Sequence, residues 1–149
     1  LQATESPMEE VLRRYLRQET YRRLHQPVFR SMVMRAYESR CAVCQLRHSP
    51  LLDAAHIVED RHERGIASVR NGLALCKIHH AAYDVGILGL TPELRVEVRA
   101  DILGEVDGPL LEHGIKKLHG RPLMVVPRRR ADRPDPELLQ IHYERFRAS

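Results

Sequence analysis

The sequence predicts an α+β fold in which a small unit of strand, loop, strand and helix lies between two flanking segments. Three observations support this prediction. Short apolar runs and one long polar loop alternate over 50–86, two pairs of metal-binding residue types flank the loop, and apolar residues outside this unit recur at helical spacing. We expect one functional unit with a helical flank at 1–40, a central part at 41–90 and an extension at 91–149.

Composition sets the outer limits of function. The formal net charge of +4 is compatible with a polyanionic partner but does not identify one. No window approaches the roughly 18 apolar residues of a membrane span, and the N-terminus lacks the basic-then-apolar layout of a signal peptide. We therefore expect no membrane partner and a cytoplasmic location. Because the chain begins at Leu1 rather than Met, it is compatible with being part of a longer polypeptide.

Apolar residues predict two helices ahead of the central part. From Pro7 to about Gln26 they recur three and four residues apart, and we expect Pro27 to end this helix. The pattern then resumes and predicts a second helix that leads into Cys41. The apolar residues concerned are Met8, Val11, Leu12, Tyr15 and Leu16 in the first helix, and Val28, Phe29, Met32, Val33, Ala36 and Tyr37 in the second.

Later elements follow from short apolar runs and turn residues. A strand over Pro50–Ile57 places His56 at its end, and a return strand at Leu73–Leu75 follows the turn residues Asn71 and Gly72. Between these strands lies a long charged loop. The remaining predictions are a short helix at Lys77–Asp84, a hairpin of Gly86–Leu90 and Leu94–Val98, a helix or helical turn at Asp107–His119, an apolar segment at Leu123–Val126, and a closing helix at Pro136–Phe146.

The three cysteines of the chain indicate a metal site. Cys41 and Cys44 are separated by two residues, as are Cys76 and His79, and such spacing lets a tight turn direct both side chains at one ion. Three cysteines cannot all pair as disulfides, which favours metal binding in a reducing compartment. Four protein ligands would leave no open position, so we expect structural zinc. The alternative is that these residues are small buried hydrophobes.

Four further residues suggest acid–base and metal chemistry. His56 stands at a strand end before an open loop, where an imidazole with an ordinary pKa of about 6.5 can accept a proton. His80 and Asp84 lie four apart on one helix face and can converge on a divalent ion. Asn71 can hydrogen-bond to backbone on both sides or lend its carbonyl oxygen to the metal. Alternatively, His56 is structural, Asn71 is only a turn residue, or His80 replaces His79 as a ligand of the structural zinc.

The order of these residues resembles that of a known family. The motifs Cys-x-x-Cys, Ala-Ala-His-Ile, Asn-Gly-Leu-Ala-Leu-Cys-x-x-His-His and Tyr-Asp-x-Gly-Ile occur in sequence across Cys41–Ile87. This arrangement is similar to that of the HNH (ββα-metal) endonucleases, in particular their restriction endonuclease branch. Residues 29–37 and 134–136 with the closing helix also look like that branch, so the first helix is the least explained part.

The resemblance implies a metal-dependent DNA endonuclease whose ββα-metal core carries a structural zinc knuckle. His56 would be the general base, Asn71 the motif asparagine, and His80 a catalytic residue and ligand of Mg²⁺ or Mn²⁺ together with Asp84. His79 then belongs to the zinc. Many family members carry Asp or His just before the general base as a metal ligand, whereas this chain has Ala55. Asp53 lies about two residues' rise away, roughly 6 to 7 Å, and is not expected to replace that ligand.

Double-stranded DNA is the partner that the resemblance implies. Arg61, Arg64 and Arg70 flank the predicted site and are candidate phosphate contacts, and Arg128–Arg130 form a further basic cluster. Restriction-type host defence is the expected role. A homodimer and a separate DNA-recognition domain are both compatible with the sequence. The alternatives are a non-catalytic zinc-knuckle module that binds DNA, and a zinc domain for protein contact whose docking surface is the first helix.

Overall fold

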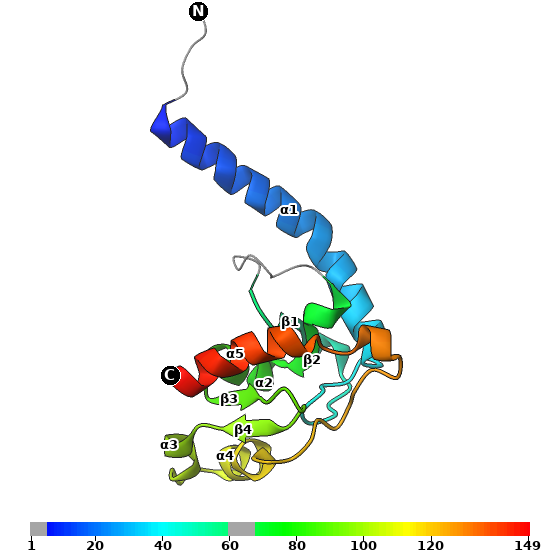
Figure 1. The fold of residues 1–149 in the computed structure, drawn as a ribbon, viewed down its shortest axis with the longest axis vertical. Helices are drawn as coiled ribbons and strands as arrows, with labels where there is room; N and C mark the ends of the chain where they lie inside the picture. The colour runs from blue at the N-terminus through cyan, green and yellow to red at the C-terminus, as the bar shows by residue number, and fades with distance from the viewer. Residues whose placement is uncertain (1–5, 60–67) are drawn as a thin grey trace, which may run out of the picture.

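The computed structural model describes residues 6–59 and 68–149, and Figure 1 traces them as a long projecting helix attached to a small α+β body. The predicted loop between the two strands of the central part falls largely in 60–67, outside the described residues. None of the described helices is both long and apolar enough to cross a membrane. In chain order the helices and strands are α1 (Pro7–Ala36), β1 (Leu52–His56), β2 (Gly72–Cys76), α2 (Lys77–Asp84), β3 (Leu88–Leu90), β4 (Val96–Val98), α3 (Ala100–Leu103), α4 (Pro109–Gly114) and α5 (Pro136–Ala148), with 3₁₀ turns at Ser49–Leu51, Val69–Asn71, Lys116–Leu118 and Arg130–Asp132.

Helix α1 is one continuous helix of 30 residues, so the prediction that Pro27 ends a first helix was wrong. A capping box between Ser6 and Glu9 starts the helix. Proline has a helical φ, but it removes one N–H from the helix and its ring crowds the carbonyl oxygen four residues earlier. The helical residues on both sides outweigh this local cost. Phe29 and Val33, just beyond the proline, are buried against the body and hold this end of the helix in place.

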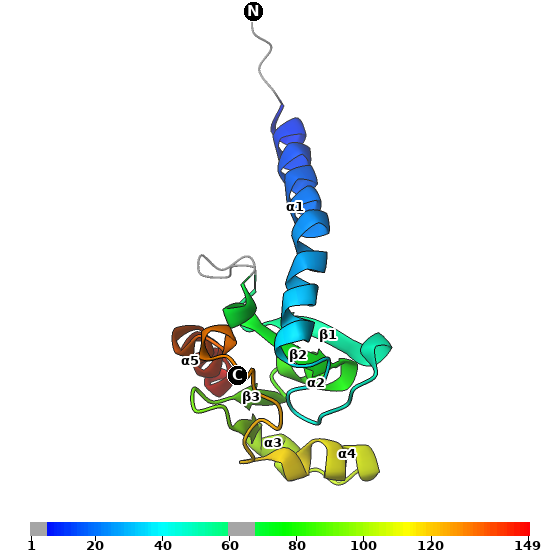
Figure 2. The same ribbon diagram turned by 90° about the vertical axis from the view of Figure 1, so that its right-hand side faces the viewer.

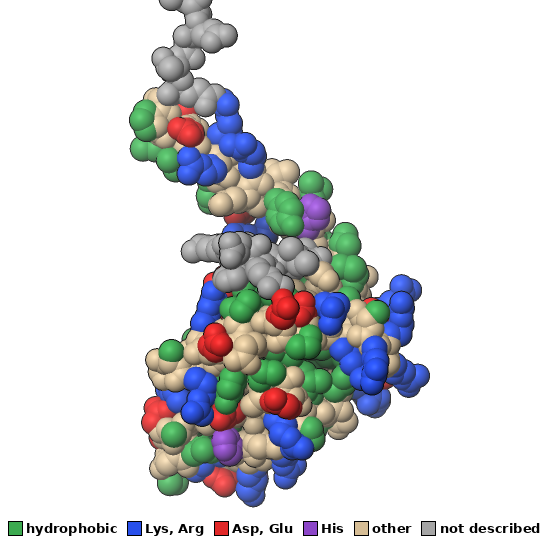
Figure 3. All heavy atoms as spheres, viewed as in Figure 1, with side chains coloured by type: hydrophobic (Ala, Val, Ile, Leu, Met, Phe, Trp, Pro, Cys, Tyr) green, Lys and Arg blue, Asp and Glu red, His purple; other side chains and the backbone are tan. Residues whose placement is uncertain are grey.

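The first part of α1 carries exposed apolar side chains. Figure 3 shows them as green patches on the projecting helix, among blue arginines. Within α1 only Phe29 and Val33 are buried, so the predicted apolar periodicity has a packing partner at the C-terminal end alone. The exposed members of this set are Met8, Val11, Leu12, Tyr15, Leu16, Tyr21, Leu24 and Val28.

Strands β1 and β2 form the antiparallel hairpin on which the central part is built. Leu52 pairs with Cys76 at one end, and His56 pairs with Gly72 at the other. Every residue of β2 is buried, because both α1 and α2 contact the hairpin. The side chain of Arg30 on α1 donates to the carbonyl oxygens of Leu52 (2.7 Å) and Ser49 (3.1 Å), which fixes the start of β1 against the helix. The predicted order of strand, return strand and helix is therefore confirmed.

A second antiparallel hairpin and a closing helix complete the body. Strands β3 and β4 pair from Leu88 with Val98 to Leu90 with Val96, as the sequence predicts, although each strand is shorter than expected. Helix α5, capped by Asp135, packs on β3; it lies across the body in Figure 1 and is seen nearly end-on in Figure 2. Over Asp107–His119, where the sequence predicts a helix or helical turn, the structure has the short α4 followed by a 3₁₀ turn. Gly114, with its low helix propensity, is the last residue of α4.

Gly72 provides a test of how closely α1 packs on the hairpin. A Cβ atom at this position would lie 2.5 Å from Cγ2 of Val33 and 3.1 Å from Cζ of Phe29. Gly72→Ala should therefore lower the free energy of unfolding by about 1–3 kcal/mol through overpacking, measured by urea denaturation with zinc present. Gly104→Ala is the control, because its added Cβ would make only an ordinary contact at 3.6 Å. Equal stability of the two variants would contradict the close packing of α1.

Candidate metal centre and active site

Three cysteines and one histidine converge on one point beside the hairpin. Cys41 and Cys44 come from the turn after α1, Cys76 from the end of β2, and His79 from the first turn of α2. Their ligand atoms all lie within 4.8 Å of one another. The Nδ1 atom of His79 is 3.2 Å from Sγ of Cys76 and 3.7 Å from Sγ of Cys41. This donor set and its closed tetrad suit structural zinc, so the predicted knuckle ligands lie together.

The backbone of α4 orients the histidine of the knuckle. His79 Nε2 lies 2.7 Å from the carbonyl oxygen of Gly114, so an N–H at Nε2 donates to that oxygen and leaves Nδ1 for the metal. Burial disfavours the charged imidazolium, but hydrogen bonds to the two sulfur atoms and to Gly114 outweigh it and raise the pKa of His79 to about 10. A metal ion must therefore displace a proton held between imidazole and sulfur. No motif or spacing in the sequence indicates the contact between His79 and Gly114.

His56 is fixed by an aromatic contact at the end of β1. Its ring stacks on Phe29 of α1, with centroids 4.2 Å apart and planes inclined by 7°. His56, His80 and Asp84 line the same pocket, whose volume is about 590 Å³. The first and last histidines of the motif therefore face one cavity. The contact with Phe29 restricts the orientation of the His56 ring.

Asn71 holds the backbone that follows His56. Its side chain is completely buried, its Oδ1 atom accepts from the N–H of Val58 at 2.9 Å, and its Nδ2 atom donates to the carbonyl oxygen of Val58, also at 2.9 Å. The sequence is compatible with two roles for Asn71, hydrogen bonding to the backbone and ligation of the metal by its carbonyl oxygen. The observed bonds correspond to the first role. Asn71 is thus a positioning residue for the strand end that carries His56.

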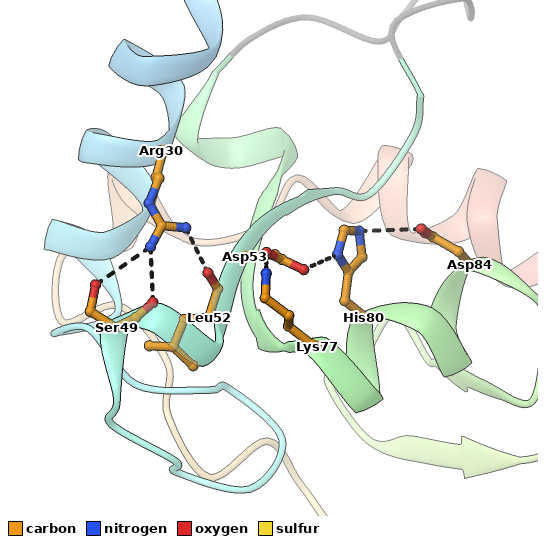
Figure 4. A network of polar contacts seen from close by, with 7 residues as sticks. All are labelled: Arg30, Ser49, Leu52, Asp53, Lys77, His80 and Asp84. Carbon is orange, nitrogen blue, oxygen red and sulfur yellow. Dashed lines mark hydrogen bonds and ion pairs between the residues drawn. The ribbon is translucent and has the colours of Figure 1, made fainter.

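His80 lies between two carboxylates, as Figure 4 shows. Its Nδ1 atom is 2.8 Å from Oδ2 of Asp53, and its Nε2 atom is 3.2 Å from Oδ2 of Asp84. Lys77 also donates to Asp53, at 2.7 Å. Burial alone would raise the pKa of Asp53, but the hydrogen bonds from His80 and Lys77 hold this pKa below its ordinary value. Asp53 is therefore a carboxylate that can orient the His80 ring.

The contact between Asp53 and His80 was not anticipated from the sequence. Ala55, at the position where many HNH endonucleases carry a metal ligand, is buried and offers no donor atom. Asp53 lies two residues earlier on the same strand and contacts the Nδ1 side of His80, opposite the Nε2 atom that meets Asp84. Its placement fits an orienting role behind the imidazole. The sequence indicated only that Asp53 and His56 lie on one short strand, and hence that Asp53 is close to the candidate active site.

The structure describes only some of the arginines that were predicted to contact DNA. Arg61 and Arg64 lie outside the described residues. Arg70 donates to the carbonyl oxygen of Arg133 and does not line the pocket. The basic cluster Arg128–Arg130 is exposed, and blue side chains gather at the right edge of Figure 3 over this segment, away from the pocket.

Two arginines that the sequence analysis did not select do line the pocket. They are Arg22 of α1 and Arg145 of α5, and α5 also contributes His142 to the wall. Both helices lie outside the motif at Cys41–Ile87, and no local spacing relates Arg22 or Arg145 to it. Their contribution appears only once the fold brings both helices beside β1 and α2.

Comparison with known proteins agrees with this geometry. Residues 41–91 match the family model described as HNH endonuclease. Among solved structures, a modification-dependent TagI restriction endonuclease is similar, with a TM-score of 0.55 and 24% sequence identity over 78% of this chain. The chain spans 36% of the length of that neighbour, and the likeness shows a shared fold. Comparison with curated proteins found no match. Residues 41–91 are thus similar to the HNH endonucleases, and the fold of the chain is shared with a restriction endonuclease.

Removing one knuckle ligand should affect stability before chemistry. Cys44→Ser is expected to abolish zinc binding and to lower the free energy of unfolding by more than about 4 kcal/mol, because the metal bond energy is part of the folding energy. Zinc content per chain and thermal denaturation measure the two effects. A folded Cys44→Ser protein that retains one zinc ion per chain would show that the tetrad is not a structural site.

Proposed function

We propose that the chain hydrolyses a phosphodiester bond of double-stranded DNA, with His56 as general base and one divalent ion held by His80 and Asp84. The observation that carries this proposal is the meeting of His56, His80 and Asp84 in one pocket within the segment that matches the HNH endonucleases. An imidazole and a carboxylate whose donor atoms are 3.2 Å apart form a donor set suited to Mn²⁺ or Mg²⁺.

In the proposed reaction His56 accepts the proton of the attacking water. The water oxygen bonds to phosphorus, the bond from phosphorus to the 3′ oxygen breaks, and that oxygen leaves with a proton from solvent. When bound, the divalent ion would reduce the negative charge on the phosphate and on the leaving oxygen. Stacking on Phe29 fixes the ring of His56, and the bonds of Asn71 to Val58 fix the backbone just beyond it.

The biological role that we propose is restriction of modified DNA. The solved neighbour is a modification-dependent restriction endonuclease, and this chain spans only about a third of it. We therefore propose that recognition of the DNA modification lies in residues outside this chain. Three thiolate ligands require a reducing environment, which favours the cytoplasm as its location. A cleavage assay of the chain on modified and unmodified DNA, each with Mg²⁺ and with Mn²⁺, tests where recognition lies. The chain alone should cut both substrates equally, and a preference for modified DNA would contradict the placement of recognition outside it.

His56→Ala should lower the rate of plasmid cleavage by at least about 100-fold, because the attacking water then has no positioned base. Zinc content, thermal stability and DNA affinity should stay near those of the wild type. His48→Ala is a matched control, because His48 is exposed and lies outside the pocket. Cleavage by His56→Ala at the wild-type rate would refute the assignment. DNA binding without cleavage by the wild type in any divalent ion would support the non-catalytic alternative.

Asp53→Ala should raise the Mn²⁺ concentration for half-maximal cleavage by about 10- to 100-fold, because His80 loses the acceptor that orients its ring. Asp53→Asn should restore part of the metal affinity, since its carbonyl oxygen can still accept from Nδ1. Asp84→Asn should shift the metal requirement in the same direction as Asp53→Ala.

The control for this series is Asp101→Asn on α3, an exposed carboxylate paired with Arg99 and absent from the pocket lining. It should leave the Mn²⁺ requirement unchanged. An unchanged requirement in Asp53→Ala would remove Asp53 from the positioning of His80.

A further inference from the structure

Helix α5 supplies the second wall of the pocket that contains His56 and His80. Its His142 ring stacks on Tyr83 of α2, with centroids 3.9 Å apart and planes inclined by 7°. Burial and the nearby charge of Arg145 lower the pKa of His142 to about 4, so this imidazole is neutral at neutral pH. The positive charge that α5 brings to the pocket is therefore that of Arg145.

Arg145 is held at the pocket by a carboxylate three residues beyond His56. Its Nη1 atom donates to both carboxylate oxygens of Glu59, each at 2.9 Å. Both side chains are about half exposed, at 45% for Arg145 and 59% for Glu59. An ion pair so open to solvent contributes roughly 0–1 kcal/mol, so its exchange for another anion costs little.

We propose that Arg145 binds a DNA phosphate at the cleavage site and that Glu59 holds its guanidinium in place until the phosphate displaces it. This inference rests on the proposed nuclease function and extends it to a residue outside the matched segment. A phosphate offers a guanidinium the same two-oxygen geometry as a carboxylate, with stronger charge. In this exchange a DNA phosphate replaces the Glu59 carboxylate beside the guanidinium of Arg145, whose position the fold already sets.

The other arginine of the same helical turn shows why the assignment falls on Arg145. Arg147 pairs with Glu97 at 3.3 Å, and neither residue lines the pocket. Arg145 pairs with Glu59, and both residues line it together with His56. Two arginines of one helix, each with a glutamate partner, thus differ in whether they face the candidate active site.

Glu59 has two effects in this arrangement. It orders the Arg145 side chain, and it places a negative charge where a phosphate must enter. Removing the charge while keeping the shape, as Glu59→Gln does, should therefore strengthen DNA binding. That gain in affinity should vanish when Arg145 is replaced by glutamine. A general effect of surface charge would instead persist in the double variant.

The test is a salt titration of binding to a 25-base-pair duplex, with every variant made in the His56→Ala background to prevent cleavage. Arg145→Gln should weaken binding about 10-fold and reduce the slope of log K against log salt by about one. Arg145→Lys should keep the slope but bind less tightly than the parent, because it retains the charge and lacks the planar guanidinium, which can donate to one phosphate through two N–H groups. Arg147→Gln is the matched control and should leave both quantities near the parent values.

Glu59→Gln should tighten binding about 3-fold, and Glu59→Gln with Arg145→Gln should bind no better than Arg145→Gln alone. Zinc content and thermal stability establish that each variant is folded. The inference is overturned if Arg145→Gln and Arg147→Gln have the same affinity and salt slope, or if the gain from Glu59→Gln persists without Arg145. Failure of the proposed function itself appears separately, as a wild-type chain that does not cleave DNA.

Discussion

The four-ligand knuckle is the constraint on which the rest of the site depends. It ties the turn after α1, the end of β2 and the first turn of α2 to one point, within 4.8 Å. Consecutive residues of a helix point about 100° apart, so fixing His79 toward the knuckle turns His80 toward the pocket. A metal ion bound at the knuckle would therefore also set the direction of the histidine beside it. The adjacency of these two histidines in the sequence directs them at two different sites.

Around this point, the two terminal helices complete the site from opposite ends of the chain. Helix α1 packs Phe29 against His56, and α5 packs His142 against Tyr83. Both contacts are between nearly parallel rings, which fix ring orientation more narrowly than aliphatic packing does. The matched segment carries the chemical groups, whereas the flanking helices hold them at defined angles and close the pocket. The helices are thus part of the site even though they lie outside the family motif.

The sequence predicted what depends on local spacing and missed what depends on long-range contact. The knuckle, the hairpin and α2 follow from residue intervals of two to four, which backbone geometry converts directly into side-chain direction. Continuation of α1 through Pro27 depends on the burial of Phe29 and Val33, which no local signal reveals. The pairing of Arg145 with Glu59 joins positions 86 residues apart. Asp53 was close to His56 in the sequence, but its relation to His80 needed the register of β1 with β2.

The pocket differs from the knuckle in how many donors the protein supplies. Among the described residues, the knuckle is the sole group of three or more metal-binding side chains within reach of one ion, whereas His80 and Asp84 offer a pair. An ion held by two protein ligands takes its remaining ligands from water or phosphate. In the proposed reaction, bound DNA therefore completes the coordination shell, and the affinities for metal and DNA rise together by the same factor. With Arg145 on the facing wall, a phosphate would meet positive charge from both sides. The ion and the arginine would then fix its position between them, next to His56.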